Sequence, residues 1–413
     1  MEQFSAIPFF DKEGMPYVPR RRVLLGLGAF GTGCVLGGAG AAQEMPDLKG
    51  KMSDEDKKKL NDNRVGLITG GPGGRYLQFG VDLARLLDNH KDLSMRVVVM
   101  FGKGSLQNIN DLYNLRSVDA AIVQADVLHY IKQLRSDELM KRGLQDIEKR
   151  VAYITRLYNE EVHVLGRYEP DGRKISELKD LDSKKVNLSE PNSGTYLTAK
   201  QVLRRAGIKV DERTDSDEIA LNKLKHGEID ALFFVTAKPA PFFSSIRPQE
   251  ANEAKLHFLV VPELVDDEQG SFKYEGGSFT HADYPGLVPE DTEVATIAAP
   301  AVLAVYNWEP SKEKRYQALV TFTQRLLEHI ESLASLSPFT KYKEIDPRAT
   351  VSDLTRFAAA EEWLTANPRG SIPAKNCRDV VTNDLLAKGI DPADVPVEEM
   401  NELGWDAKRQ GRC

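Results

Sequence analysis

Strand-like apolar runs and helix-like amphipathic segments alternate along the chain from Val65 onward. The apolar runs lie at 65–68, 95–100 and 120–123, and the segments between them place apolar residues at helical spacing. This alternation predicts a parallel β-sheet with helices on both of its faces, which is an α/β fold.

The same pattern returns in the second half of the chain. Strand-like runs occupy 185–188 and 231–235, and a helical segment at 196–206 lies between them. The order of helix, turn, aspartate and apolar strand that ends at Val123 is repeated in the stretch that ends at Val235. We therefore predict two small doubly wound units whose loops face each other across a cleft.

Two long apolar stretches are expected to connect these units. The stretch at 151–167 contains two strand-like runs around a polar centre, and the run at 292–306 is long enough to return to the first unit. Two strands that cross between lobes form a hinge, so the pattern predicts closure over a ligand. We expect the crossings near Val162–Arg167 and Ala298–Tyr306.

The predicted organisation separates the chain into an export segment, a linker, two lobes and an extension. The export signal is expected at 1–42, a linker with one short helix at 43–64, a discontinuous lobe I at 65–162 and 301–368, lobe II at 163–300, and a C-terminal extension of open role at 369–413. The folded body is expected to begin at Val65, because the charged linker before it lacks apolar periodicity.

The first residues have the three parts of an export signal. Three arginines at 20–22 precede a weakly hydrophobic, glycine-rich run at 23–42, and the small residues at 39–41 suit a cleavage site. The arginines resemble the twin-arginine type, which predicts a periplasmic location. Removal of the segment and its retention as a membrane anchor both stay open. The formal GxGxxG at 26–31 is rejected as a dinucleotide fingerprint, because no βαβ unit surrounds it.

The composition of the chain argues against nucleic-acid binding and against a metal site. The 413 residues carry a net charge of −7, and 28% are charged, which gives no nucleic-acid footprint. The histidines and the three cysteines lack metal-ligand spacing, so we predict no metal site and no cofactor. If the signal is removed with Cys34, then Cys377 and Cys413 remain, and a disulfide between them in an oxidising periplasm would contribute roughly 3 kcal/mol.

A glycine-rich turn joins the first predicted strand to the first predicted helix. The turn at 70–74 holds four glycines and a proline, and the helix ends near Leu87. Such a junction leaves backbone N–H groups at the helix start without partners, which suits an anion or another polar ligand. Glycines that only make a tight corner would give the same sequence, so both interpretations stay open.

Polar residues follow two more strands of the first unit. Gly104 and Ser105 stand between a strand and a helix, where Ser105 suits either an N-cap or a ligand contact. Gln124 and Asp126 follow the third strand, at the sheet edge where open α/β sheets bind their ligands. These residues are therefore candidates for the cleft wall of the first unit.

The second unit has a similar junction. Asn192, Ser193 and Thr195 lie between a strand-like run and a helix, and they place several donors at one helix start. This arrangement suits a carboxylate or a phosphate, because the helix dipole favours negative charge there. The two units are thus predicted to hold one anionic ligand between them.

Several of these motifs together resemble the TRAP-associated extracytoplasmic immunogenic protein (TAXI) family, the solute receptors of TRAP transporters. They keep the family's order and spacing over about 65–333, and they are TGGPGGRY with FG (69–80), GKGSLQNINDL (102–112), VDAAIVQADV (118–127), LYNEEVHVLGR (157–167), NSGTYLTAKQVLRRAGI (192–208) and GEIDALFFV (227–235). The resemblance implies a fold like that of type II periplasmic binding proteins, with two lobes, a two-strand hinge and a cleft. It implies a receptor without enzymatic activity that delivers a small anionic solute, such as glutamate or another carboxylate, to a TRAP-type membrane permease.

The resemblance also implies a set of ligand-binding residues and no catalytic residue. They come from the junctions described above and from the hinge, and they are Gly73, Gly74, Tyr76, Ser105, Asn108, Gln124, Asp126, Tyr158, Glu160, Ser193, Gly194 and Thr195. The chain departs from the family at Leu77 and Gln78, where a second aromatic residue and a proline are usual, and this changes one pocket wall. Arg75 stands at a variable apolar position, where it could add positive charge at the cleft mouth or simply be solvated, and we favour the solvated position.

Two other functions are weighed against transport. A binding protein that presents its closed form to a signalling partner would have the same sequence features, and a permease gene beside this one would favour transport. A periplasmic enzyme is disfavoured, because Glu160 and Glu161 form the one carboxylate pair near the predicted cleft. Neighbours on a strand point to opposite faces, so these two carboxylates are not expected to act together.

Overall fold

The computed structural model describes residues 52–71, 74–88, 94–134, 136–141, 143–169, 171–264, 272–367, 374–396, 399–400 and 403. The chain divides into two units, 1–51 and 52–413, and all of the described residues belong to the second. The first unit lies outside the described residues, as do the predicted export signal and Cys34 that it contains. The predicted pairing of Cys377 with Cys413 lies outside them as well.

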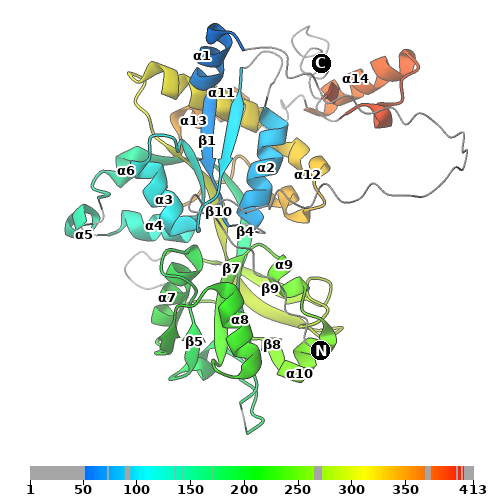
Figure 1. Cartoon of the computed structure of the whole chain (residues 1–413). Coiled ribbons are helices and arrows are strands. Elements are labelled where there is room, and N and C mark those ends of the chain that lie inside the picture. The colour runs from blue at the N-terminus through cyan, green and yellow to red at the C-terminus, as the bar shows by residue number, and fades with distance from the viewer. Residues whose placement is uncertain are drawn as a thin grey trace, which may run out of the picture. The chain divides into compact units, whose positions relative to one another are not determined.

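A ten-stranded sheet runs through the second unit (Figure 1). The strands of its first half follow the order β2-β1-β3-β10-β4, with β1 at Arg64–Ile68, β2 at Arg96–Met100, β3 at Ala120–Gln124, β4 at Val151–Arg167 and β10 at Glu293–Tyr306. β1 is parallel to both β2 and β3, whereas β10 is antiparallel to β3 and β4. The predicted α/β fold with parallel strands is therefore confirmed.

Helices cover both faces of this half of the sheet. α2 (Arg75–Leu87), α11 (Glu313–His329) and α13 (Ala358–Ala366) pack on one face, and α3 (Ser105–Asn114) and α4 (Ala125–Lys132) pack on the other. β1 contributes side chains to both cores, because successive side chains of a strand point to opposite faces of the sheet. Val65 and Leu67 join the first core, and Ile68 joins the second.

The second half of the sheet continues the order as β4-β7-β5-β6. Its strands are β5 (Lys185–Asn187), β6 (Asp211–Arg213), β7 (Ala231–Thr236), β8 (Leu256–Phe258), which pairs with β4, and β9 (Glu275–Thr280), which pairs with β10. Its helices are η1 (Leu178–Leu181), α7 (Gly194–Ala206), α8 (Asp217–His226), α9 (Pro241–Ser244) and α10 (Pro248–Ala254). α7 and η1 pack into one core, and α8, α9 and α10 pack into another. We keep the names lobe I (65–162 and 301–368) and lobe II (163–300) for the two halves.

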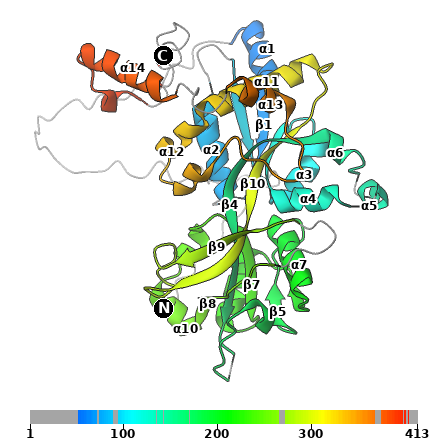
Figure 2. The same cartoon turned by 180° about the vertical axis from the view of Figure 1, so that it is seen from behind.

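The long strands β4 and β10 belong to both halves (Figures 1 and 2). β10 pairs with β3 at its carboxyl end and with β9 at its amino end, and β4 pairs with β10 and then with β7. The stretch at 151–167 forms one continuous strand, where two runs were expected. The register between β10 and β4 shifts after Pro300, because proline has no N–H to donate to the ladder.

Shorter elements complete the described part of the chain. They are α1 (Asp54–Asp62), α5 (Ser136–Lys141), α6 (Ile147–Arg150), η2 (Ile330–Ser332), α12 (Leu333–Leu336), η3 (Thr340–Glu344), α14 (Ala374–Ala387) and η4 (Pro392–Asp394). α1 lies within the predicted linker and is capped by Ser53, whose hydroxyl accepts from the N–H of Asp56 at 3.0 Å. Among the described helices, none has both the length and the apolar character that crossing a bilayer requires.

Candidate ligand-binding site

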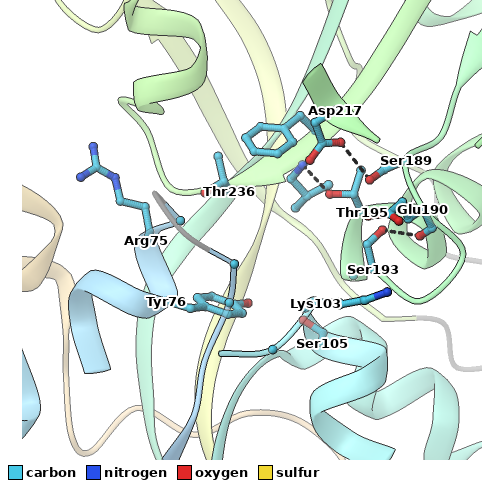
Figure 3. Close-up of a pocket in the computed structure, with 18 of the residues that line it drawn as sticks. Arg75, Tyr76, Lys103, Ser105, Ser189, Glu190, Ser193, Thr195, Asp217 and Thr236 are labelled. Atoms are coloured by element: carbon cyan, nitrogen blue, oxygen red, sulfur yellow. Dashed lines mark hydrogen bonds between the residues drawn. The ribbon is translucent and has the colours of Figure 1, made fainter. Parts of the chain in front are cut away.

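A cavity of about 720 Å³ lies between the loops of the two lobes (Figure 3). Lobe I contributes the turns before α2 and α3, the end of β3 and the middle of β4, and lobe II contributes the turn before α7, the start of α8, the end of β7 and α9. The lining residues used below are Gly74, Arg75, Tyr76, Lys103, Gly104, Ser105, Gln124, Glu160, Ser189, Glu190, Ser193, Gly194, Thr195, Asp217 and Glu218. The volume suits a small solute.

Two helices of lobe I begin at the cavity without a side-chain cap. The N-cap of α2 is Gly74 and the N-cap of α3 is Gly104, so neither has a side chain to accept from the free amides of the first turn. Gly104 has a φ of 124°, a conformation that favours glycine. Ser105, which suited the N-cap position by its type, is instead the first residue inside α3. The Gln107 N–H of α3 bonds to the Asn192 carbonyl, whereas the other amides at these two helix starts have no side-chain cap and suit a ligand.

Ser105 and Gln124 bond to each other at the base of the cavity. The Ser105 hydroxyl donates to Oε1 of Gln124 at 3.2 Å and accepts from the Gln124 N–H at 3.0 Å. Gln124 is 2% exposed, and its Nε2 has no hydrogen-bond partner. A buried amide group without an acceptor is unfavourable. This donor therefore suits an oxygen of a bound solute.

The start of α7 is the cavity wall of lobe II. The Ser193 hydroxyl caps the helix, because it accepts from the Tyr196 N–H at 3.0 Å and donates to the Glu190 carbonyl at 2.7 Å. Thr195 is buried, and its hydroxyl accepts from the Val235 N–H at 3.0 Å. The side chain of Ser193 is thus used for capping, whereas the hydroxyl hydrogen of Thr195 is still available to a ligand.

The starts of α3 and α7 come close to each other across the cavity. The Gln107 N–H donates to the Asn192 carbonyl at 3.3 Å, which joins lobe I to lobe II. A β-carbon added to Gly194 would lie 1.6 Å from Oε1 of Gln124 and 2.8 Å from the Ser105 hydroxyl oxygen. Only glycine fits at position 194 while the lobes lie this close.

The carboxyl group of Glu160 lies in the cavity wall on β4. Its Oε2 accepts from the Tyr76 hydroxyl at 2.5 Å, and the residue is 2% exposed. Burial raises the pKa of Glu160 to about 8, against the opposing effect of the Tyr76 hydrogen bond. Burial thus favours the neutral carboxylic acid form of Glu160 near neutral pH.

A second carboxyl group lines the lobe II side. Asp217 is the first residue of α8, and its Oδ1 accepts from the Ser189 hydroxyl at 2.9 Å (Figure 3). Burial raises the pKa of Asp217 to about 6, and the Ser189 hydrogen bond acts against this. Glu190 and Glu218 are exposed in the same lining. The sequence analysis missed Asp217, although an acidic residue in the first turn of a helix was a usable signal.

Three of the predicted contact residues have side chains that do not line this cavity. Asn108 donates from Nδ2 to the Thr69 and Ile122 carbonyls at 2.7 and 2.9 Å, so it joins strands of lobe I. Asp126 accepts from the Thr198 hydroxyl at 2.7 Å and lines a smaller hollow beside α4. Tyr158 packs in the first core of lobe I. Gly73 lies outside the described residues.

The expectation that Arg75 is solvated is wrong, because its guanidinium is bonded to other residues of the protein. Its guanidinium donates from Nη2 to the Pro239 carbonyl of lobe II and from Nη1 to Oε1 of Gln78 at 2.8 Å. The same group stacks on the Phe339 ring, 4.4 Å from the ring centre. Arg75 thus bridges the two lobes at the cavity margin, and Figure 3 shows it pointing away from Ser193.

Thr195 gives a test of the lobe II wall. Thr195→Val keeps the volume but leaves the Val235 N–H without an acceptor, so we expect lobe II to lose roughly 1–3 kcal/mol of stability and the ligand to bind more weakly. Thr195→Ser keeps the oxygen and is the matched control, with near-parental values for both. Urea unfolding and calorimetric titration measure the two effects. A valine variant with parental stability would contradict the role of the Thr195–Val235 hydrogen bond.

Among the described residues, no group of three or more His, Cys, Asp or Glu side chains is placed to hold a metal ion. The lining instead combines backbone amides, hydroxyls, one carboxamide and several carboxyl groups. Such a lining can hold a small polar solute by hydrogen bonds, with Arg75 and Lys103 as its cations.

The strand order β2-β1-β3-β10-β4 and the cavity between two linked half-sheets give the chain a fold like that of type II periplasmic binding proteins. The chain belongs to the NMT1-like family, which matches residues 67–361.

Several solved solute-binding proteins are similar to this chain. An ancestral arginine-binding protein bound to arginine is 17% identical with a TM-score of 0.35, and the match covers 64% of this chain and 97% of that one. The alkanesulfonate-binding protein SsuA from Xanthomonas axonopodis pv. citri is 12% identical with a TM-score of 0.36, over 83% and 97%. A TctC solute binding protein from Polaromonas is 17% identical with a TM-score of 0.35, over 67% and 88%.

Proposed function

We propose that this protein is an extracytoplasmic solute receptor that captures a small carboxylate between lobe I and lobe II. The observation that carries the proposal is the convergence of helix starts on one cavity. α2 and α3 of lobe I begin there without side-chain caps, and α7 of lobe II begins opposite them. Helix starts carry partial positive charge and free N–H groups, which together favour a carboxylate.

Closure of the lobes is the proposed mode of capture. Lobe I and lobe II move as two bodies about β4 and β10, and contacts between the lobes hold the closed form. The carboxylate of Asp126 on α4 accepts from the Thr198 hydroxyl of α7 and from the Tyr274 hydroxyl at 2.9 Å, which supports this mode. The hydrogen bond from the Arg75 guanidinium to the Pro239 carbonyl also joins lobe I to lobe II, at the margin of the cavity.

The destination of the solute is proposed to be a TRAP-type membrane permease. The resemblance of the glycine-rich and hinge motifs to the TAXI family supports this partner, and a twin-arginine export signal at 1–42 would place the receptor in the periplasm. Tyr76, Ser105, Gln124, Glu160, Gly194 and Thr195 are proposed as the residues closest to the bound carboxylate.

The direct test is a thermal-shift panel of L-glutamate, succinate and 2-oxoglutarate, with ATP as the control ligand. A carboxylate that binds should stabilise the protein by ~2.7 kcal/mol at a hundred times its dissociation constant, and ATP should give no shift. Isothermal titration calorimetry then measures the affinity. Stabilisation by ATP and by none of the carboxylates would contradict the proposal.

A further inference from the structure

The Glu160 carboxyl group lies at the cavity with no cation paired to it among the described residues. The nearby ammonium group of Lys341 bonds instead to the neighbouring Glu161 at 2.6 Å, and its charge lowers the pKa of Glu160 less than burial raises it. The two cations of the lining are also placed elsewhere. Arg75 is bound to Pro239 and Gln78, and Lys103 is exposed.

Uncharged hydrogen-bonding groups surround Glu160 instead. Tyr76, which donates to Glu160, is the second residue of α2, so the carboxyl group lies beside the uncapped start of that helix. The Ser105 hydroxyl interacts with Tyr76 and bonds to Gln124, whose Nε2 has no partner. One connected row of groups therefore runs from Glu160 to the free donor of Gln124.

This row is suited to an anion and not to a cation. A helix start and an unpartnered amide donor both favour negative charge, so a ligand ammonium group placed here would be repelled by its surroundings. A neutral carboxylic acid adds a further donor, and its O–H bond to a carboxylate oxygen would be short and strong. A protonated Glu160 would therefore match a solute carboxylate at this place in the lining.

We propose that Glu160 binds the solute carboxylate as a protonated acid, so that one proton is shared between two carboxyl groups and is bound together with the solute. This inference rests on the proposed function, since it concerns the same cavity and the same class of ligand. It makes Glu160 a residue that determines specificity: it favours a carboxylate and disfavours an ammonium group at this end of the cavity.

The proposal sets the pH dependence of binding. The pKa of free Glu160 is raised to about 8 by its burial, so below that pH the acid is already protonated and the affinity is constant. Above that pH the carboxylate must take up a proton before the solute binds, and the affinity falls by about tenfold per pH unit. A bound carboxylate raises the pKa of Glu160 further, because like charges disfavour ionisation.

The other ionisable groups near Glu160 come from every element packed around it. They are Arg75 and Tyr76 of α2, Asp126 of α4, Tyr158 and Glu161 of β4, and Lys341 and Tyr342 of the η3 segment. Burial, and next the charge of Glu160, raise the pKa of Tyr76 well above its usual value, so its hydroxyl stays protonated. Asp217, across the cavity, has a pKa of about 6 and has ionised before pH 8 is reached.

The experiment is calorimetric titration of wild type and Glu160→Gln between pH 7 and pH 9.5 with succinate, 2-oxoglutarate and L-glutamate. Glutamine keeps a hydrogen-bond donor at position 160 but does not ionise, so Glu160→Gln, whatever its affinity at pH 7, should lack the loss above pH 8. Because both proteins meet the same probe at each pH, the ratio of their affinities cancels any effect of ionisation of the probe itself. A ratio that does not change with pH would overturn the proposal, and so would a wild-type affinity that rises toward pH 8, which would indicate an ammonium partner.

A second variant tests the proposal even if Glu160→Gln does not fold. Tyr76→Phe removes a hydrogen bond that lowers the pKa of Glu160. The affinity of this variant should therefore begin to fall at a higher pH than the affinity of wild type. An unchanged midpoint would overturn the proposal. Failure of all three carboxylates to bind at any pH would overturn the proposed receptor function itself, whereas pH-independent binding would overturn only the role of Glu160.

Discussion

Gly194→Ala is expected to weaken carboxylate binding by roughly tenfold or more while each lobe still folds. The added β-carbon would meet Gln124 and Ser105 of lobe I, at 1.6 and 2.8 Å, although position 194 belongs to lobe II. The clash exists only when the lobes are close, so opening relieves it and the penalty falls on the closed state. Overpacking of this kind costs about 1–3 kcal/mol, and every 1.4 kcal/mol is tenfold in affinity.

Gly71→Ala is the matched control for this variant. Gly71 lines the same cavity, and a β-carbon added there meets nothing within 4 Å. We expect near-parental affinity for Gly71→Ala in calorimetry. In a Gln124→Ala background, Gly194→Ala should have a much smaller effect, because most of the clash has been removed. Equal losses with and without Gln124 would contradict the steric explanation.

Lys341→Met is expected to destabilise the whole protein by about 3–5 kcal/mol, the usual effect of removing one partner of a buried ion pair. Lys341 bonds to Oε1 of Glu161 at 2.6 Å, and the two side chains are 6% and 3% exposed. Oε2 of Glu161 accepts from the Lys238 N–H at 2.9 Å. Burial lowers the pKa of Lys341, but Glu161 and Glu344 more than offset this, so the lysine stays charged.

Chemical denaturation measures this change in stability. Lys57→Met is the matched control, because the Lys57–Asp54 pair is exposed, and a surface pair contributes only about 0–1 kcal/mol. Lys341→Met combined with Glu161→Gln should recover much of the loss, since it removes the uncompensated charge on the hinge strand. A Lys341→Met protein as stable as wild type would show that the pair does not stabilise the hinge.

The sequence predicted the elements better than the partners of individual side chains. The apolar run of β1 and the helical spacing in α2 depend on local geometry, so the strand at Arg64–Ile68 and the helix at Arg75–Leu87 lie where they were predicted. Ser105 shows the limit. Its type suits an N-cap, but the backbone of Gly104 places the cap one residue earlier, and the Ser105 hydroxyl bonds to Gln124.

The predicted ligand contacts show the same limit. A polar residue near a strand end faces either the cavity or the backbone of a neighbouring strand, and the choice depends on residues distant in the chain. Asn108 bonds to the Thr69 carbonyl, whereas Gln124, in a similar position, lines the cavity. Arg75 bonds to a carbonyl 164 residues away, which no local pattern indicates.

The sequence by itself determined the alternation of strands and helices, the glycine turns that leave helix starts uncapped, and the repeat of one unit in each half of the chain. These features follow from the periodicity and the backbone freedom of neighbouring residues. Only the tertiary structure decided that Glu160 has no paired cation in the described part of the chain while Glu161 is paired with Lys341, 180 residues away. The reason is that ionisation and hydrogen bonding depend on burial and on partners brought together by the fold, and adjacent residues of one strand lie in different surroundings.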